Sequence, residues 1–234
     1  MRNLQSSVLF SLPFIGYQPA NISNNQPALD ACNIVKQTIC GAPFKWPWNR
    51  SEIDATVSAD DQTFTINLPN FGFLEQAWIT NPVDGKVNQL TIKTSLAAES
   101  AVQRPESIAA QMQDVTTGDV VFRFNTLLDQ EYWLGGYYQM APIPMASLAC
   151  SWAPIPDALG YIYDWGALAL ISMITKDIRL PFFSQKFVSH LLGAQDGLTA
   201  LERNIFIGDW LTILTEPARA QLTGQQGVQA RGQS

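Results

Sequence analysis

The chain of 234 residues carries 14 Lys and Arg against 20 Asp and Glu, which gives a formal net charge of −6 at pH 7. This balance argues against a protein that coats nucleic acid, because basic residues are not in excess to displace phosphate counterions. Charged residues make up 15% of the chain, below the roughly 25% of a typical domain, while aromatic residues make up 11%. A surface with so few charges is often covered by another subunit.

The N-terminal part predicts an extended arm followed by one helix. Residues 1–24 are largely apolar, and Pro13, Gly16 and Pro19 are expected to break any helix there. Side chains that can cap a helix follow at residues 23–25, and the apolar residues up to Ile39 then recur on one helical face. The first helix is therefore expected to end at Gly41.

Beyond residue 53 the apolar residues alternate, which is typical of strands. Residues 56–58 and 63–68, joined by a turn at residues 59–61, predict a β-hairpin whose Phe64, Ile66 and Leu68 point inward. Further strands are predicted at Leu74–Thr80, Val87–Ile92, Ser107–Met112, Asp119–Asn125 and Tyr132–Gln139. About seven short strands separated by turns indicate a small antiparallel sandwich or barrel.

Helical periodicity returns after residue 155. The segment Leu159–Ile174 is apolar nearly all the way round, so it is expected to be buried on every side. A second helix follows with an apolar face from Phe183 to Leu192, and Thr199 and Glu202 form a capping box that starts a third. No membrane span is predicted, because the apolar run of residues 155–174 contains a proline and two aspartates.

The expected fold is α+β, with a helical bundle domain built from N- and C-terminal segments and an inserted antiparallel β-sandwich or barrel. Residues 1–45 and 150–217 form the helical domain, residues 46–149 the β domain, and residues 218–234 a flexible tail. The chain crosses between the domains twice, and tryptophan and proline lie at both crossings. We expect these residues to pack together as the domain junction: Trp46, Trp48, Trp152 and Pro154.

No catalytic, cofactor-binding or metal-binding residues are predicted, and the chain is not expected to be an enzyme. The single histidine, His190, lies on the polar face of its helix, and the three cysteines have neither CxxC spacing nor companion histidines. Glu52 and Asp54 alternate with apolar residues and are expected to decorate a strand. Gly135-Gly136 predicts a bulge or a close backbone approach.

Aromatic residues on the predicted strands allow two interpretations. Exposed aromatic side chains on a β-sandwich can stack on sugar rings, whereas alternating members can instead fill the core and contact a neighbouring subunit. We favour the second. The residues concerned are Phe71, Phe73, Trp78, Tyr132, Trp133, Tyr137 and Tyr138.

Four stretches give the chain a resemblance to head-to-tail adaptor proteins of tailed phages, the podovirus tail tubular protein A class. They are Asn25–Asn33, Phe44–Arg50, Trp152–Asp157 with Tyr161–Tyr163, and Gln185–Phe187 through Asn204–Phe206. The resemblance implies a virion structural protein, without enzymatic activity, that forms a twelve-fold ring between the portal protein and the tail nozzle. It implies no membrane partner, passage of viral DNA through the lumen without sequence-specific binding, and presence in the host cytoplasm during assembly.

The resemblance also implies roles for individual residues. The C-terminal segment would reach the portal, with contacts at Pro217, Arg219, Leu222, Val228 and Arg231. The apolar helix would contribute to subunit packing through Ile162, Trp165, Leu168 and Ile171. The alternatives are another neck or tail-completion protein, or a glycan-binding tail module that uses the aromatic residues of the sheet.

Overall fold

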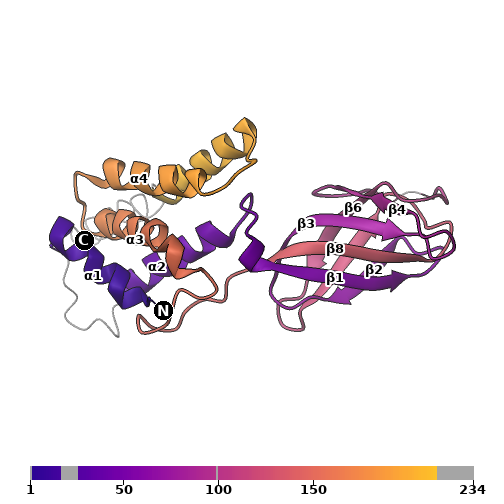
Figure 1. The fold of residues 1–234 in the computed structure, drawn as a ribbon, viewed down its shortest axis with the longest axis horizontal. Coiled ribbons are helices and arrows are strands. Elements are labelled where there is room, and N and C mark those ends of the chain that lie inside the picture. The colour runs from indigo at the N-terminus through magenta and orange to yellow at the C-terminus, as the bar shows by residue number, and fades with distance from the viewer. Residues whose placement is uncertain (1, 17–25, 99, 215–234) are drawn as a thin grey trace, which may run out of the picture. The chain divides into compact units, whose positions relative to one another are not determined.

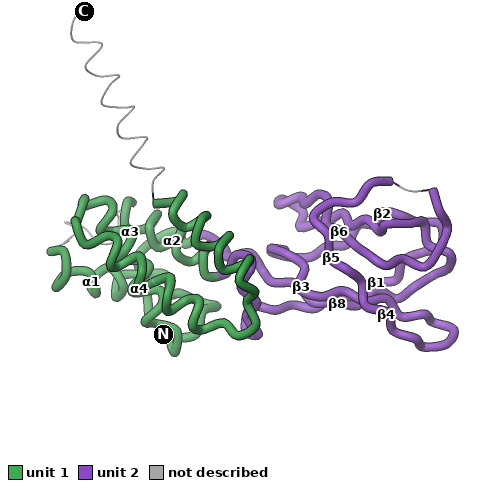
Figure 2. Tube along the Cα trace, turned by 90° about the horizontal axis from the view of Figure 1, so that it is seen from above, with its two compact units in different colours: residues 1–39, 145–234 green, residues 40–144 purple. Residues whose placement is uncertain are grey.

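The structure is a computed structural model that describes residues 2–16, 26–98 and 100–214. The chain forms two compact units, shown in different colours in Figure 2: unit 1 comprises Met1–Ile39 and Met145–Ser234, and unit 2 comprises Cys40–Pro144. Unit 1 is helical and unit 2 contains the strands, so the α+β prediction with an inserted β domain is confirmed. The divisions lie after residues 39 and 144, against predicted boundaries after residues 45 and 149.

Unit 1 begins with a helix where an extended arm was predicted, so that prediction was wrong. Helix α1 runs over Leu4–Ile15 and includes Pro13. Asn3 caps it, accepting a hydrogen bond from the Ser6 main-chain N–H at 2.9 Å, and Gly16 ends it with a φ of 65°. Because Pro13 lies in the last turn, it removes one hydrogen bond near a helix end and leaves the earlier turns intact.

Three further helices follow the predicted order (Figure 1): α2 covers Gln26–Cys40, α3 Gly160–Ile174 and α4 Leu180–Gly193. Helix α3 lies against both α1 and α4, and most of its side chains are buried, as its uniformly apolar sequence predicted. A Cβ atom at Gly166 would lie 2.7 Å from Val35 of α2 and 2.9 Å from Phe187 of α4. Glycine at this position therefore lets both helices approach α3. The predicted caps at residues 23–25 lie outside the described residues.

The last described helix covers residues 200–214 and begins at the predicted capping box. The Thr199 hydroxyl donates to Glu202 Oε2 at 2.7 Å and accepts from the Glu202 main-chain N–H at 3.2 Å. Glu202 Oε2 also accepts from the Thr199 main-chain N–H at 2.8 Å. Two N–H groups that a helix start leaves without partners are thereby satisfied.

Unit 2 consists of two four-stranded sheets that do not close into a barrel. The first has the order β1–β8–β3–β4, with β1 at Arg50–Val57, β8 at Tyr132–Met140, β3 at Phe71–Thr80 and β4 at Val87–Gln89. The second has the order β2–β7–β6–β5, with β2 at Thr63–Asn67, β7 at Asp119–Phe124, β6 at Ser107–Gln113 and β5 at Thr91–Ile92. All pairs are antiparallel except β5 with β6.

The predicted hairpin is wrong, because β1 and β2 belong to different sheets. β1 pairs with β8 and β2 with β7. The turn between them is held by Leu128: the Asp60 N–H donates to the Leu128 carbonyl at 2.9 Å, and the Leu128 N–H donates to the Asp61 carbonyl at 3.2 Å. The turn thus passes from one sheet to the other. Likewise the predicted strand Val87–Ile92 splits at buried Leu90 into β4 and β5, one in each sheet.

The core of unit 2 lies between the sheets. Phe64 and Ile66 pack against this core and Leu68 is part of it, as predicted. Other members come from both sheets, among them Ile53, Phe71, Leu74, Ile79, Ile108, Phe122, Phe124, Leu134 and Tyr138.

Within each unit, the two chain segments that lead to the other unit lie close together. In unit 2, Arg50 at the start of β1 is the cross-strand partner of Gln139 near the end of β8. In unit 1, the Asn33 side chain accepts from the Met145 main-chain N–H at 2.8 Å and donates to its carbonyl at 3.2 Å. The discontinuous unit is therefore joined where its two segments meet.

Candidate assembly surface

The predicted junction residues of the first crossing lie in unit 2. The indole rings of Trp46 and Trp48 stack with centroids 5.3 Å apart, and Trp46 is 4% exposed. The Trp46 N–H donates to Gln139 Oε1 at 3.1 Å, and Gln139 Nε2 donates to the Trp46 carbonyl at 3.2 Å. This pair of hydrogen bonds fixes the segment to strand β8.

A buried carboxylate lies beside this segment. Arg50 donates two hydrogen bonds to Glu75, at 3.0 and 2.5 Å, and Gln139 donates a third at 2.7 Å. Burial raises the pKa of Glu75, but the hydrogen bonds from Arg50 and Gln139 outweigh it and leave the pKa below its ordinary value. The charged form of Glu75 is thus stabilised by Arg50 of β1 and Gln139 of β8.

The junction residues of the second crossing lie in unit 1. Trp152 is fully buried and stacks on Tyr163 with centroids 4.5 Å apart, whereas Pro154 is exposed. The Trp152 indole N–H donates to the Ser7 hydroxyl at 2.9 Å, and that hydroxyl donates to Asp164 at 2.7 Å. The contacts described here place each tryptophan within its own unit, and packing of all four junction residues together stays a prediction.

Asp164 is a buried acidic residue of unit 1. Its carboxylate forms an ion pair with Arg2 at 2.7 Å. Burial raises the pKa of Asp164 above its ordinary value, although Ser7 and Arg2 both lower it. Burial and the same carboxylate also raise the pKa of Cys32. Cys32 is a buried free thiol.

Of the four residues predicted for subunit packing, three are occupied inside unit 1. Ile162, Leu168 and Ile171 are 0% exposed, so in this conformation they fill the unit's own core. Only Trp165 keeps exposed surface, on the side of α3 that α1 and α4 flank. Three of the four residues therefore belong to the core of unit 1, and subunit packing through Trp165 stays a prediction.

Trp165 belongs to a group of five aromatic rings, here called the bundle cluster. Its ring centroid lies 5.6 Å from Phe10 and 5.7 Å from Phe14 of α1, and 6.3 Å from Phe183 and 6.5 Å from Phe182 of α4. Phe183 is buried, Phe182 is 51% exposed, and the other three rings are half-buried. The bundle cluster therefore continues from the core of unit 1 to its surface.

Two cations border the bundle cluster. The Arg179 guanidinium lies 5.5 Å from the Phe183 ring centroid and donates to the Phe14 carbonyl, and the Lys186 ammonium lies 5.6 Å from the Phe182 centroid. Hydrogen bonds from the Arg179 side chain and main chain lower the pKa of Asp177 to about 2. Exposed rings with a charged rim are typical of surfaces that bind another protein.

The helix of residues 200–214 adds further apolar surface to unit 1. Its inner side is anchored by Trp210, whose indole N–H donates to Ser184 at 2.7 Å and whose ring lies 4.6 Å from Phe187. Its outer side exposes four large apolar side chains: Leu201 at 69%, Ile205 at 54%, Ile207 at 36% and Leu211 at 54%. Scattered apolar residues are ordinary, but this many on one short helix favour a covered surface.

Sequence reasoning missed two of the five rings of the bundle cluster, Phe10 and Phe14, because α1 was not predicted. The i, i+4 spacing of Phe10 and Phe14 was the available signal, since it places both rings on one helical face. The predicted portal contacts at residues 217–231 lie outside the described residues.

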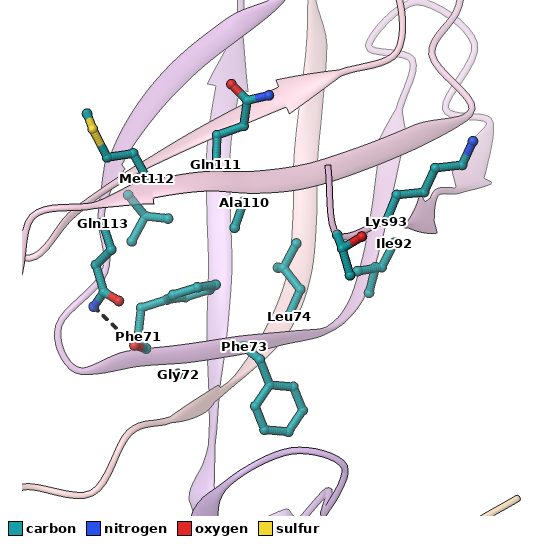
Figure 3. Close-up of a pocket in the computed structure, with 12 residues that line it drawn as sticks. Phe71, Gly72, Phe73, Leu74, Ile92, Lys93, Ala110, Gln111, Met112 and Gln113 are labelled. Atoms are coloured by element: carbon teal, nitrogen blue, oxygen red, sulfur yellow. Dashed lines mark hydrogen bonds between the residues drawn. The ribbon is translucent and has the colours of Figure 1, made fainter. Parts of the chain in front are cut away.

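Unit 2 contains a groove of about 400 Å³ between β3 of one sheet and β5 and β6 of the other. It opens where both β3 and β6 continue beyond their shorter neighbours, since β4 pairs with β3 only over Trp78–Thr80 and β5 with β6 only at two positions. Figure 3 shows Phe71 and Leu74 directed into this groove and Phe73 directed away from it. Gln113 closes one end by donating to the Phe71 carbonyl at 3.0 Å (Figure 3).

Comparisons with known proteins identify no relative: no protein-family model matches the sequence, and no curated protein matches it significantly. Among residues 2–16, 26–98 and 100–214, no cluster of His, Cys, Asp and Glu could hold a metal ion. Within the same residues, every helix is too short or too polar to cross a membrane.

Proposed function

We propose that this protein is a ring-forming head-to-tail adaptor of a tailed phage, which joins the portal to the tail. The observation that supports the proposal best is the bundle cluster, whose rings reach the surface of unit 1 at Phe182 and Trp165. An aromatic surface on a helical unit suits repeated contact with copies of the same chain. The four stretches of resemblance to phage adaptors supply the specific role.

In this proposal unit 1 forms the ring and unit 2 is carried on it. Subunits in a closed ring meet through two different surfaces, one on each side of the protomer. The bundle cluster is one candidate side, and the outer side of the helix of residues 200–214 is another. A ring of twelve copies follows from the resemblance alone.

The proposed partners are the portal above and the tail nozzle below. The segment Pro217–Ser234 follows the last described helix and is proposed to contact the portal. The net charge of −6 suits a lumen through which DNA slides, because an acidic wall does not hold phosphate.

The assembly surface is tested with Phe182→Ser. This change removes a half-exposed ring, so the protomer is expected to fold, and it should abolish ring formation on portal particles of the same virus. Electron microscopy of the mixture is the measurement. The matched control is Val83→Ser, which removes an 87% exposed apolar side chain from a turn of unit 2 and should leave rings intact. Normal rings with Phe182→Ser would show that the bundle cluster is not a subunit contact.

The portal contact is tested separately by deleting residues 217–234. We expect the shortened protein to lose binding to portal particles in a sedimentation assay. Unchanged binding would remove the assigned role of this segment, and absence of binding by the intact chain would overturn the adaptor proposal itself.

A further inference from the structure

The outer face of the sheet β1–β8–β3 carries aromatic residues that the core does not use. Successive side chains of β8 and β3 point to opposite faces of the sheet. This alternation places the aromatic residues noted in the sequence on different faces. Phe71, Tyr132 and Tyr138 are at most 5% exposed and face the core. Three others lie on the opposite face and are here called the aromatic shelf: Trp78, Trp133 and Tyr137.

Gly135 allows the aromatic shelf to lie close to the sheet. It is the cross-strand partner of Trp78, and a Cβ atom at this position would lie 2.4 Å from Trp78 Nε1. The Trp78 ring therefore occupies the space above the glycine, and its centroid lies 5.4 Å from that of Tyr137 in an edge-to-face arrangement. A residue with any side chain at position 135 would displace the indole.

Charged groups beside Tyr137 hold its ring in place. The Arg50 guanidinium lies 5.0 Å from the Tyr137 ring centroid and is fixed by its two hydrogen bonds to Glu75, which is 7% exposed. Gln139 fixes Glu75 in turn. The Tyr137 and Trp78 rings are thus ordered before binding and lose little side-chain entropy when a ligand contacts them.

The shelf borders a depression of about 300 Å³ that also has polar walls. Its lining includes Glu52 and Asp54 of β1 and Thr80 of β3, together with Trp133, which is 52% exposed. No ion pair or hydrogen bond joins either carboxylate side chain to another group in the described part of the chain. Gln76 is the cross-strand partner of Tyr137, and Gln89 is that of Trp78, so both glutamines lie on the same face as the shelf.

We propose that this depression binds a neutral sugar ring of a glycan. The ring would stack its C–H face on Trp133, and its hydroxyl groups would donate to Asp54 and Glu52 and accept from Thr80 and Gln76. Stacking surface beside both donors and acceptors is what a polyhydroxylated ring requires. The two carboxylates disfavour uronic and sialic acids through like-charge repulsion.

A cationic guest fits the same surface less well. The guanidinium of Arg50 already lies against the Tyr137 ring, so this ring is not open to a second cation, although Glu52 and Asp54 would attract one. The donor hydrogens of Thr80, Gln76 and Gln89 would also find no partner on a guest without an acceptor. The inference concerns unit 2 alone and is independent of ring formation by unit 1.

The test is an array of oligosaccharides probed with the full-length protein. Its arms are neutral hexose and N-acetylhexosamine chains, and chains containing uronic or sialic acid. We expect binding to at least one neutral chain, loss of roughly tenfold or more in affinity with Trp133→Ala, and a smaller loss with Asp54→Asn. Met112→Ala, which shortens a 65% exposed side chain on the other sheet, is the matched control and should bind as the wild type does.

Four outcomes overturn the proposal. Three are no binding to any neutral chain, binding that Trp133→Ala leaves unchanged, and preference for the acidic chains. A fourth is displacement of the bound glycan by N-acetylarginine amide at lower concentration than by free neutral sugar, since that would identify a cation site. Near-unchanged melting temperatures of the variants establish that lost binding is not lost folding.

Discussion

Asp164 is the residue at which charge and burial compete most directly in unit 1. It is 3% exposed, it pairs with Arg2, and burial nevertheless leaves its pKa above the ordinary value. The folded state therefore binds a proton more readily than the unfolded state, for which the pKa is about 3.9. Stability contributed by this group is fully present below that unfolded value and is lost as the pH rises through the folded pKa.

This sign gives a testable prediction for Asp164→Asn, which imitates the protonated side chain and cannot titrate. The wild type should gain stability relative to the variant as the pH is lowered from 7 towards 4. Urea denaturation at several pH values measures the difference. If acidification lowered the stability of the wild type relative to the variant, the Arg2 ion pair, and not burial, would control the pKa of this carboxyl group.

Helix α1 shows at the scale of an element how a local signal is overridden. Its stop at Gly16 and its cap at Asn3 are visible in the sequence, but Pro13 predicts a break that the helix does not show. We predict that Asn3→Ala destabilises the protein by about 1 kcal/mol, because the Ser6 N–H loses its side-chain partner. Thermal unfolding measures the loss, and Asn3→Ser, which keeps an acceptor oxygen, should restore most of it. Equal melting temperatures for the alanine variant and the wild type would show that the cap contributes nothing.

The elements differ in how far the sequence could predict them. Alternation located β7 and β8 to within a residue or two, because each of these strands has one face on the core. β6 was located as closely, although its first three residues are all buried and its last three all exposed. Strand pairing was not predictable, since the turn after Val57 joins strands of different sheets and only contact with distant Leu128 decides this. Uniform apolarity predicted that α3 is buried, but it could not say that Tyr161 and Trp165 reach the surface.

The candidate sites were predictable to a similar extent. Sequence alternation indicated that some aromatic residues leave the core, and the close approach at Gly135-Gly136 was expected. The partner at that approach was not, because Trp78 is 57 residues away from Gly135 along the chain and meets it only through the pairing of β3 with β8. The bundle cluster required α1, and therefore could not be assembled from the sequence.

At the scale of the whole molecule, unit 2 is a continuous stretch of chain with its own core. We predict that residues 40–144 expressed alone fold and unfold in one cooperative transition, because the sheet partners and core residues of unit 2 all lie within this stretch. Circular dichroism on heating measures it. A broad transition without a folded baseline would show that the sandwich depends on the helices. If the fragment is stable, the glycan array can be repeated on it without any ring.

The pairing of Arg50 with Gln139 in one unit and of Asn33 with Met145 in the other has a consequence for how this protein can change. The chain leaves unit 1 and re-enters it at neighbouring points, so the sandwich is an insertion that does not separate the two segments of the helical unit. A sandwich with sheets of another size, or a short peptide linker, could replace unit 2 without a change in the positions of the helices. Selection on what the sandwich recognises is thereby uncoupled from selection on what the helices build.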